Sequence, residues 1–84
     1  MKPLVQLDLF PIDLHLQRID SAKNMRRFYV ARIEPNLFGE WCVVRRWGRI
    51  GARGQQKTEW FDNAGRAHDA LGRVARGKRR RGYK

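Results

Sequence analysis

Residues 41–61 read WCVVRRWGRIGARGQQKTEWF, and this stretch decides the fold. Two runs rich in β-branched and aromatic residues, 41–47 and 55–61, flank a loop with glycine at every third position. Runs of this kind that are bounded by glycine-rich segments are typical of strands joined by a turn. We therefore predict two successive strands of an antiparallel sheet here.

The residues before this stretch predict two more strands. From Asp13 apolar and polar residues alternate, so that Leu14 and Leu16 face one side of a strand that ends near Asp20. A polar turn over 21–24 precedes residues 26–34, which are again rich in aromatic and β-branched side chains. Residues 35–39 carry turn residues at both ends and connect this second strand to the third.

The residues after the fourth strand predict one helix. Asp62 can cap it, because its carboxylate can accept hydrogen bonds from the exposed amides of the first turn. Alanine, leucine and valine recur at helical spacing from Ala64 to Ala75 and would pack on the sheet, and Gly77 would end the helix. The predicted class is α+β, an antiparallel sheet of four to five strands with one packed C-terminal helix. The expected organisation is an N-terminal arm over 1–12, a domain over 13–77 and a basic tail over 78–84.

Composition narrows the function classes. The 84 residues include 19 Lys or Arg and 8 Asp or Glu, for a net charge of +11, and residues 45–84 carry +10 of it. Such a field favours a polyanion, most simply nucleic acid. The helix offers only small and aliphatic residues opposite its charges, so an anionic membrane surface is the weaker candidate.

Several classes are not expected. No run of 18 or more apolar residues exists, and the apolar N-terminal stretch lacks a signal-peptide cleavage site. The single cysteine, Cys42, excludes a disulfide framework and favours a reduced, cytoplasmic location. Nucleoid association is the matching expectation for a protein that binds nucleic acid. No nucleophile–base set, metal-ligand spacing or cofactor motif occurs, so we predict no enzyme, no catalytic residue, no metal and no cofactor.

The triplet Trp47-Gly48-Arg49 carries the functional inference. A tryptophan at a strand end can stack on a base or sugar, and an arginine two residues later can contact phosphate. The competing interpretation is that Trp47 belongs to the core and Arg49 to a solvated loop, because tryptophan is usually largely buried.

The triplet stands in a wider pattern that resembles the WGR domain. The pattern comprises Arg27-Phe28-Tyr29, Trp47 to Gly51, Gly54-Gln55 and Gly82-Tyr83, and it covers about residues 14–84. WGR domains occur in DNA-damage-activated poly(ADP-ribose) polymerases and as short bacterial proteins. The resemblance implies an antiparallel sheet with one helix and DNA binding at strand breaks. The polymerases' other domains have no counterpart here, so no catalytic activity is implied.

The resemblance also implies roles for individual residues. The family's tryptophan packs against the terminal nucleotide and its arginine contacts phosphate or neighbouring domains, which would fall on Trp47 and Arg49. The basic pair before the Phe-Tyr motif lies near DNA in that family. Arg26 and Arg27 match that basic pair. Gln55, Lys57 and Tyr83 match the family's glutamine, the basic strand position after it and the terminal tyrosine.

The basic C-terminal segment has two interpretations. It is either a solubilising end or a phosphate clamp, and we favour the clamp because the same half of the chain carries the triplet. Its members are Arg73, Arg76, Lys78, Arg79, Arg80 and Arg81. Composition fits RNA as well, so a small RNA-binding protein remains an alternative to DNA binding, and the sequence assigns no oligomeric state.

A second motif lies in the arm. Gln6-Leu7-Asp8-Leu9-Phe10 resembles the peptide with which bacterial replication and repair proteins dock on the replicative sliding clamp. Such a peptide places a Leu-Phe anchor in an apolar pocket. The alternative is that Leu7, Leu9 and Phe10 pack on this chain's own sheet. An adaptor that docks on the clamp is therefore an alternative function.

Overall fold

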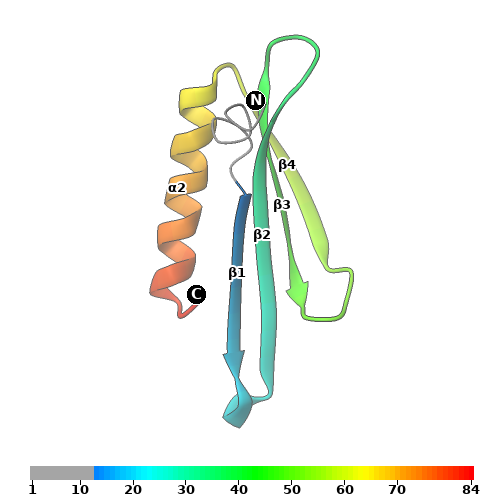
Figure 1. Cartoon of the computed structure of the whole chain (residues 1–84), viewed down its shortest axis with the longest axis vertical. Coiled ribbons are helices and arrows are strands. Elements are labelled where there is room, and N and C mark those ends of the chain that lie inside the picture. The colour runs from blue at the N-terminus through cyan, green and yellow to red at the C-terminus, as the bar shows by residue number, and fades with distance from the viewer. Residues whose placement is uncertain (1–12) are drawn as a thin grey trace, which may run out of the picture.

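The strands of the computed structural model, which describes residues 13–84, form one antiparallel sheet in the order β1-β2-β3-β4 (Figure 1). One helix covers one face of this sheet. The elements are β1 (Asp13–Asp20), the short 3-10 turn η1 (Ser21–Lys23), β2 (Met25–Pro35), β3 (Trp41–Arg49), β4 (Gln55–Phe61) and α2 (Ala64–Arg80). The predicted α+β class is confirmed, with four strands.

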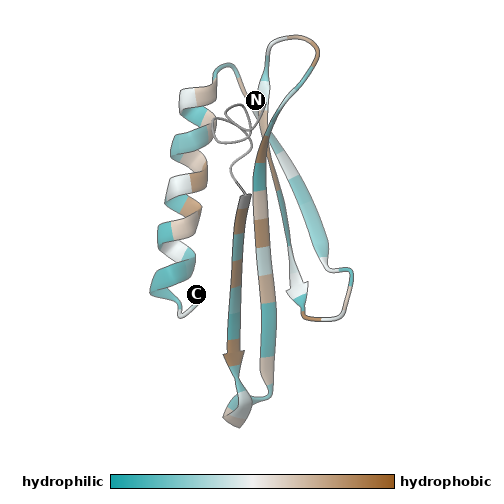
Figure 2. Ribbon diagram, in the orientation of Figure 1, coloured by the Kyte–Doolittle hydropathy of each residue, from teal (hydrophilic) through white to brown (hydrophobic). Residues whose placement is uncertain are grey.

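The strand register assigns each side chain to a face, because directly paired residues of an antiparallel sheet project to the same side. Leu16 pairs with Tyr29, and Tyr29 pairs with Trp47. Apolar and polar residues alternate along most of β1, as Figure 2 shows, and along β2 the buried residues Tyr29, Ala31 and Ile33 are spaced two apart. One face therefore collects the large apolar side chains and the other is left more polar.

The core lies between the apolar face of the sheet and α2. Ile33 and Val43 are 1% exposed and meet Ala67 and Leu71 from the helix. The alanines of α2 let the helix approach the sheet closely. The helix needs this support, because Gly65, Gly72 and Gly77 each cost about 1 kcal/mol relative to alanine.

Two predicted helix boundaries are wrong. The N-cap is Asn63, whose side chain accepts a hydrogen bond from the backbone of Arg66 at 2.9 Å, and Asp62 instead lies 3.7 Å from the Arg66 guanidinium. The helix also passes through Gly77 and ends three residues later. A glycine within a helix lowers its stability by only about 1 kcal/mol relative to alanine, so packing of the helix on the sheet is enough to extend the helix beyond Gly77.

The last residues, predicted as a tail, are folded onto the domain. The backbone amides of Gly82 and Tyr83 bond the carbonyls of Arg79 and Lys78, at 3.0 and 3.1 Å, with Gly82 at φ +97°. This is the Schellman arrangement that ends helices at a left-handed residue. Tyr83 is buried, and Lys84 exchanges two 2.9 Å backbone bonds with Gln17 of β1. The basic segment therefore has a fixed position.

The predicted docking peptide, residues 6–10, lies outside the described residues. Within residues 13–84, no helix is long and apolar enough to cross a membrane.

Candidate nucleic-acid interface

The loop after β3 is built around two glycines. A Cβ on Gly48 would lie 2.7 Å from the Cα of Gly54, and a Cβ on Gly54 would collide with the carbonyl oxygen of Trp47. Gly54 also has φ +78°, which glycine adopts readily. The glycine of the triplet therefore allows the two ends of the loop to touch, which fixes where the chain turns from β3 into β4.

Trp47 is half-buried at the edge of the core. Its ring stacks on Tyr29 of β2, with ring centroids 6.2 Å apart and planes inclined by 23°. Offset stacking of this kind adds about 0.5–1.5 kcal/mol beyond burial. One side of Trp47 therefore packs against the core, and the residue also lines a groove; stacking of its ring on a base or sugar stays a prediction.

We name this hollow the helix-side groove; it lies between β3 and the end of α2 and has a volume of about 420 Å³. Of the lining residues within 13–84, three are cationic and none is acidic. The lining residues are Tyr29, Arg45, Trp47, Val74, Gly77, Lys78 and Arg81. An aromatic floor with cationic walls suits an anion that carries a planar or sugar group.

Two polar atoms of the groove residues lack partners. Tyr29 Oη and Arg45 Nε are buried and make no hydrogen bond within the described residues. Burial raises the pKa of the Tyr29 hydroxyl, and the nearby Arg45 guanidinium offsets part of that rise. Arg45 is held by an ion pair at 2.9 Å between its Nη2 and Glu59 Oε1. Both unpartnered groups can donate a hydrogen bond, so an oxygen-rich ligand would satisfy them.

Lys78 contacts two aromatic rings at the groove. Its ammonium lies 4.7 Å from the ring centroid of Tyr29 and 5.1 Å from that of Tyr83. Burial lowers the pKa of Lys78, and the positive charges of Arg81, Arg27 and Arg45 lower it further. The two rings favour the charged form, but no carboxylate among residues 13–84 forms an ion pair with Lys78. An added anion would therefore be stabilised here.

A row of three arginines crosses the sheet beside the groove. Arg18 pairs with Arg27, and Arg27 pairs with Arg49, so the three side chains share the helix-side face. Neighbouring strands lie about 4.8 Å apart, which spaces the charges closely. None of the three ion pairs among residues 13–84 involves this arginine row. No ion pair among residues 13–84 therefore offsets the mutual repulsion of the row, although Asp20 lies two residues from Arg18 on the same face.

Arg49 also has a structural role. Its Nη1 donates to the carbonyl oxygen of Asn24 at 3.1 Å, and its Nη2 to the Asn24 side chain at 3.3 Å. Asn24 has φ 51° at the turn after η1, so Arg49 ties the β3 end to the β1–β2 turn. Its guanidinium is still exposed and can serve both purposes.

The structure brings together some of the sequence-predicted site residues. Trp47 and Arg49 share their face with Arg27, Gln55 and Lys57, as the register requires. Lys78 and Arg81 reach the same region from the end of α2.

Other predicted residues lie elsewhere. Arg26 neighbours Arg27 along the strand and so projects to the opposite face. Tyr83 is 7% exposed and belongs to the core. The remaining basic residues of the helix are exposed on α2 but do not line the groove; these are Arg73, Arg76, Arg79 and Arg80.

Sequence reasoning missed Arg18, Tyr29 and Arg45 as members of this region. Alternation along each strand gives their face, but only the pairing register places Arg18 in line with Arg27 and Arg49. The Tyr29–Trp47 pair follows from the same register.

The cysteine and the histidines form no site with acidic residues. Among residues 13–84 no group of three His, Cys, Asp or Glu is close enough to hold a metal ion. Burial raises the pKa of the Cys42 thiol, as does the neighbouring Glu34, so the thiolate form is disfavoured.

Comparison with known proteins gives one family. Residues 12–84 match the family model of the WGR domain. The chain is 43% identical over 74 residues to the uncharacterized protein y4dW of Sinorhizobium fredii, which covers 88% of this chain and 36% of that protein. It is 37% identical over 46 residues to poly(ADP-ribose) polymerase 2-A of Oryza sativa subsp. japonica, covering 54% of this chain and 7% of the polymerase. No solved structure matches.

Proposed function

Because this chain belongs to the WGR domain family, we propose that it is a non-catalytic module that binds DNA by its sugar-phosphate backbone near strand ends or nicks. The family is a domain type that is not catalytic by itself. The chain spans about a third of the bacterial relative and less than a tenth of the polymerase, so neither protein's whole activity is carried over.

One observation supports the proposal above the others. Trp47 lies between the arginine row and the cationic end of α2, and none of the described residues that line the groove is acidic. In this proposal Trp47 packs on a terminal sugar or base, and the cations contact the flanking phosphates. The Tyr29 hydroxyl and the Arg45 Nε–H, which have no partner among the described residues, would donate hydrogen bonds to a phosphate oxygen.

The exposed end of a duplex is the favoured target for a geometric reason. Trp47 is held against Tyr29 and is only half-exposed, so it cannot insert deeply between stacked base pairs. A terminal nucleotide already presents a free stacking surface. Little base readout is expected, because backbone contacts carry no sequence information.

The test compares a blunt linear duplex with a closed circle of the same sequence, for the parent and for Trp47→Ala. We expect the parent to prefer the linear form and Trp47→Ala to lose that preference, with a loss of about 1–3 kcal/mol in binding free energy. Equal affinity of the parent for the two forms would rule out end binding. A preference for structured RNA at matched salt would favour the RNA alternative.

A second function, docking on the bacterial sliding clamp, is proposed on the sequence of residues 6–10 alone. The double variant Leu9→Ala, Phe10→Ala should abolish clamp binding, because those residues would form the apolar anchor, and should leave DNA affinity unchanged. Absence of clamp binding by the intact chain would remove this function.

A further inference from the structure

We propose that the sheet face opposite α2 is a second nucleic-acid site, one that binds a single strand. We name it the open face. The proposal rests on residues that the helix-side groove does not use, so the two sites can be separated by mutation.

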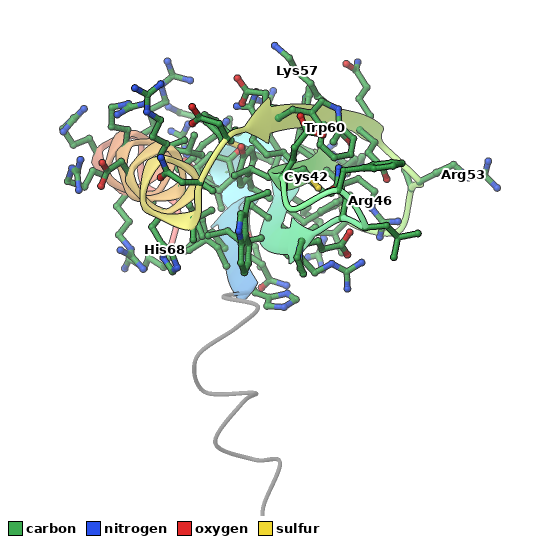
Figure 3. The ribbon with its side chains drawn as sticks, turned by 90° about the horizontal axis from the view of Figure 1, so that it is seen from above. Cys42, Arg46, Arg53, Lys57, Trp60 and His68 are labelled. Atoms are coloured by element: carbon green, nitrogen blue, oxygen red, sulfur yellow. The ribbon has the colours of Figure 1, made fainter. Side chains whose placement is uncertain are left out.

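The register defines the members of the open face. His15, Val30, Arg46 and Gln56 are paired in one row across all four strands. Trp60 lies two rows away on β4, and Phe28 lies one row away on the other side. Figure 3, which looks along the length of the molecule, places Arg46 and Arg53 on the side away from α2.

Trp60 is the largest aromatic side chain that the open face exposes to solvent. Its exposed fraction is 58%, although Cys42, its partner on β3, is buried. The alternation of side chains along β4 explains why the Trp60 side chain points to the open face. It does not explain why a tryptophan stands at a position exposed to solvent. An indole ring fixed on a strand is a stacking surface that accepts any base.

The centre of the face supplies charge and hydrogen-bonding groups. A shallow depression of about 230 Å³ is lined by the paired row of His15, Val30, Arg46 and Gln56, with Val44 and Arg32 beside it. The Arg46 guanidinium lies 5.8 Å from the Phe28 ring centroid and forms no ion pair within the described residues. Guanidinium groups held against a ring present their edge to phosphate or to a base.

The dimensions fit a short extended strand. Phe28 and Trp60 are opposite Gly48 and Cys42 of β3, respectively. Six residues of an extended strand cover about 20 Å, which is the scale of a site for a few nucleotides. A four-stranded antiparallel sheet with exposed aromatics is a platform that single-stranded RNA or DNA commonly occupies.

Charge favours nucleic acid over a protein partner or a second copy of this chain. Three cations, Arg26, Arg32 and Arg46, project from the face. The one acid on its described side chains is Glu34, which is neutralised by Arg32 at 2.8 Å. A second copy would bring the same excess positive charge to the contact.

The experiment measures binding of a labelled 12-nucleotide oligothymidine and of a blunt duplex by anisotropy. We expect Trp60→Ala to weaken oligothymidine binding about tenfold and duplex binding less than twofold. Arg46→Gln, which leaves the core untouched, should weaken the oligothymidine in the same direction. Phe38→Ala is the matched control, because Phe38 is 85% exposed but lies in the β2–β3 turn.

Several outcomes would overturn the proposal. The parent could fail to bind oligothymidine, or folded Trp60→Ala and Arg46→Gln could bind it like the parent. Loss of oligothymidine binding in Trp47→Ala alone would place the single strand in the helix-side groove. Sedimentation showing a dimer that Trp60→Ala dissociates would make the open face a protein interface. The end preference of Trp47→Ala tests only the helix-side groove, and oligothymidine binding by Trp60→Ala tests only the open face. A negative result for one site therefore leaves the other site testable.

Discussion

Gly48 must be glycine because of a close backbone contact with Gly54, not because of its intrinsic preference for a turn. We expect Gly48→Ala to destabilise the fold by about 1–3 kcal/mol, because its Cβ would lie 2.7 Å from the Cα of Gly54 and backbone would have to move. Urea unfolding followed by tryptophan fluorescence measures the change. Gly77→Ala is the control: a Cβ there meets nothing within 4 Å and should stabilise the helix by up to about 1 kcal/mol. Equal stability of both variants would contradict the account of the loop.

Lys78 makes a prediction about pH. Its pKa in the folded chain is below the ordinary 10.5, so the unfolded chain binds more protons in the window between the two values. The free energy of unfolding should therefore rise with pH across that window and be lowest, for this group, below it. A bound phosphate restores the lysine's charge, so DNA binding in that window should take up a proton.

Calorimetry at alkaline pH in two buffers of different protonation enthalpy measures this uptake. Lys78→Arg should abolish it, because arginine stays protonated throughout. An unchanged uptake in that variant would place the titrating group elsewhere.

At the scale of elements, the C-terminal turn distinguishes a folded end from a tail. Tyr83→Ala should cost about 3–5 kcal/mol, because the ring is 7% exposed and packs in the core beneath Lys78. Thermal unfolding by circular dichroism measures the loss. Arg80→Ala, one exposed residue in the same turn, should change stability by less than about 0.5 kcal/mol. Similar melting of the two variants would show that the turn contributes nothing to the core.

The strands were predictable because their signals are local. Alternation over residues 13–20 and the β-rich run 55–61 gave the observed bounds of β1 and β4. The end of α2 was not predictable from propensity, because Gly77 and Gly82 are both plausible stops and only the burial of Tyr83 selects the second. The N-cap was misplaced by one residue, since Asp62 and Asn63 carry equally suitable oxygens.

The site was predictable in part because some of its residues also form a local sequence signal. The triplet drew attention to Trp47 and Arg49 through its residue types, and the structure gives them neighbours of the expected charge. The basic pair Arg26-Arg27 could not be resolved from sequence, because a strand sends consecutive residues to opposite faces. The Tyr29–Trp47 stack and the arginine row depend on which residues of neighbouring strands are paired. The sequence of one strand does not give this pairing.

At the scale of the whole molecule, acids and cations are unevenly distributed along a domain whose longest extent is 45 Å, although Asp20 at the end of β1 lies near the arginine row. Glu34, Glu40 and Asp62 lie towards the end that holds the β2–β3 turn and the start of α2 (Figure 1). The arginine row and the end of α2 lie towards the other end. Such a field orients the molecule as it approaches a polyanion and speeds productive encounter.

The salt dependence of duplex binding tests this arrangement. Each phosphate that a cation neutralises contributes about −0.9 to the slope of log affinity against log salt. Arg27→Ala should therefore make the slope shallower by about 0.9, because Arg27 is the middle of the arginine row and forms no ion pair with any residue of 13–84.

Arg66→Ala is the matched control for that measurement. It removes the same charge from an exposed arginine, but Arg66 lies at the start of α2 beside Asp62, 3.7 Å away. The two variants have the same net charge, so a general attraction between a basic protein and DNA would change both slopes equally. A shallower slope in Arg27→Ala alone requires phosphates to bind at the arginine row. Equal slopes in the two variants would instead show that the protein binds polyanions without a defined site.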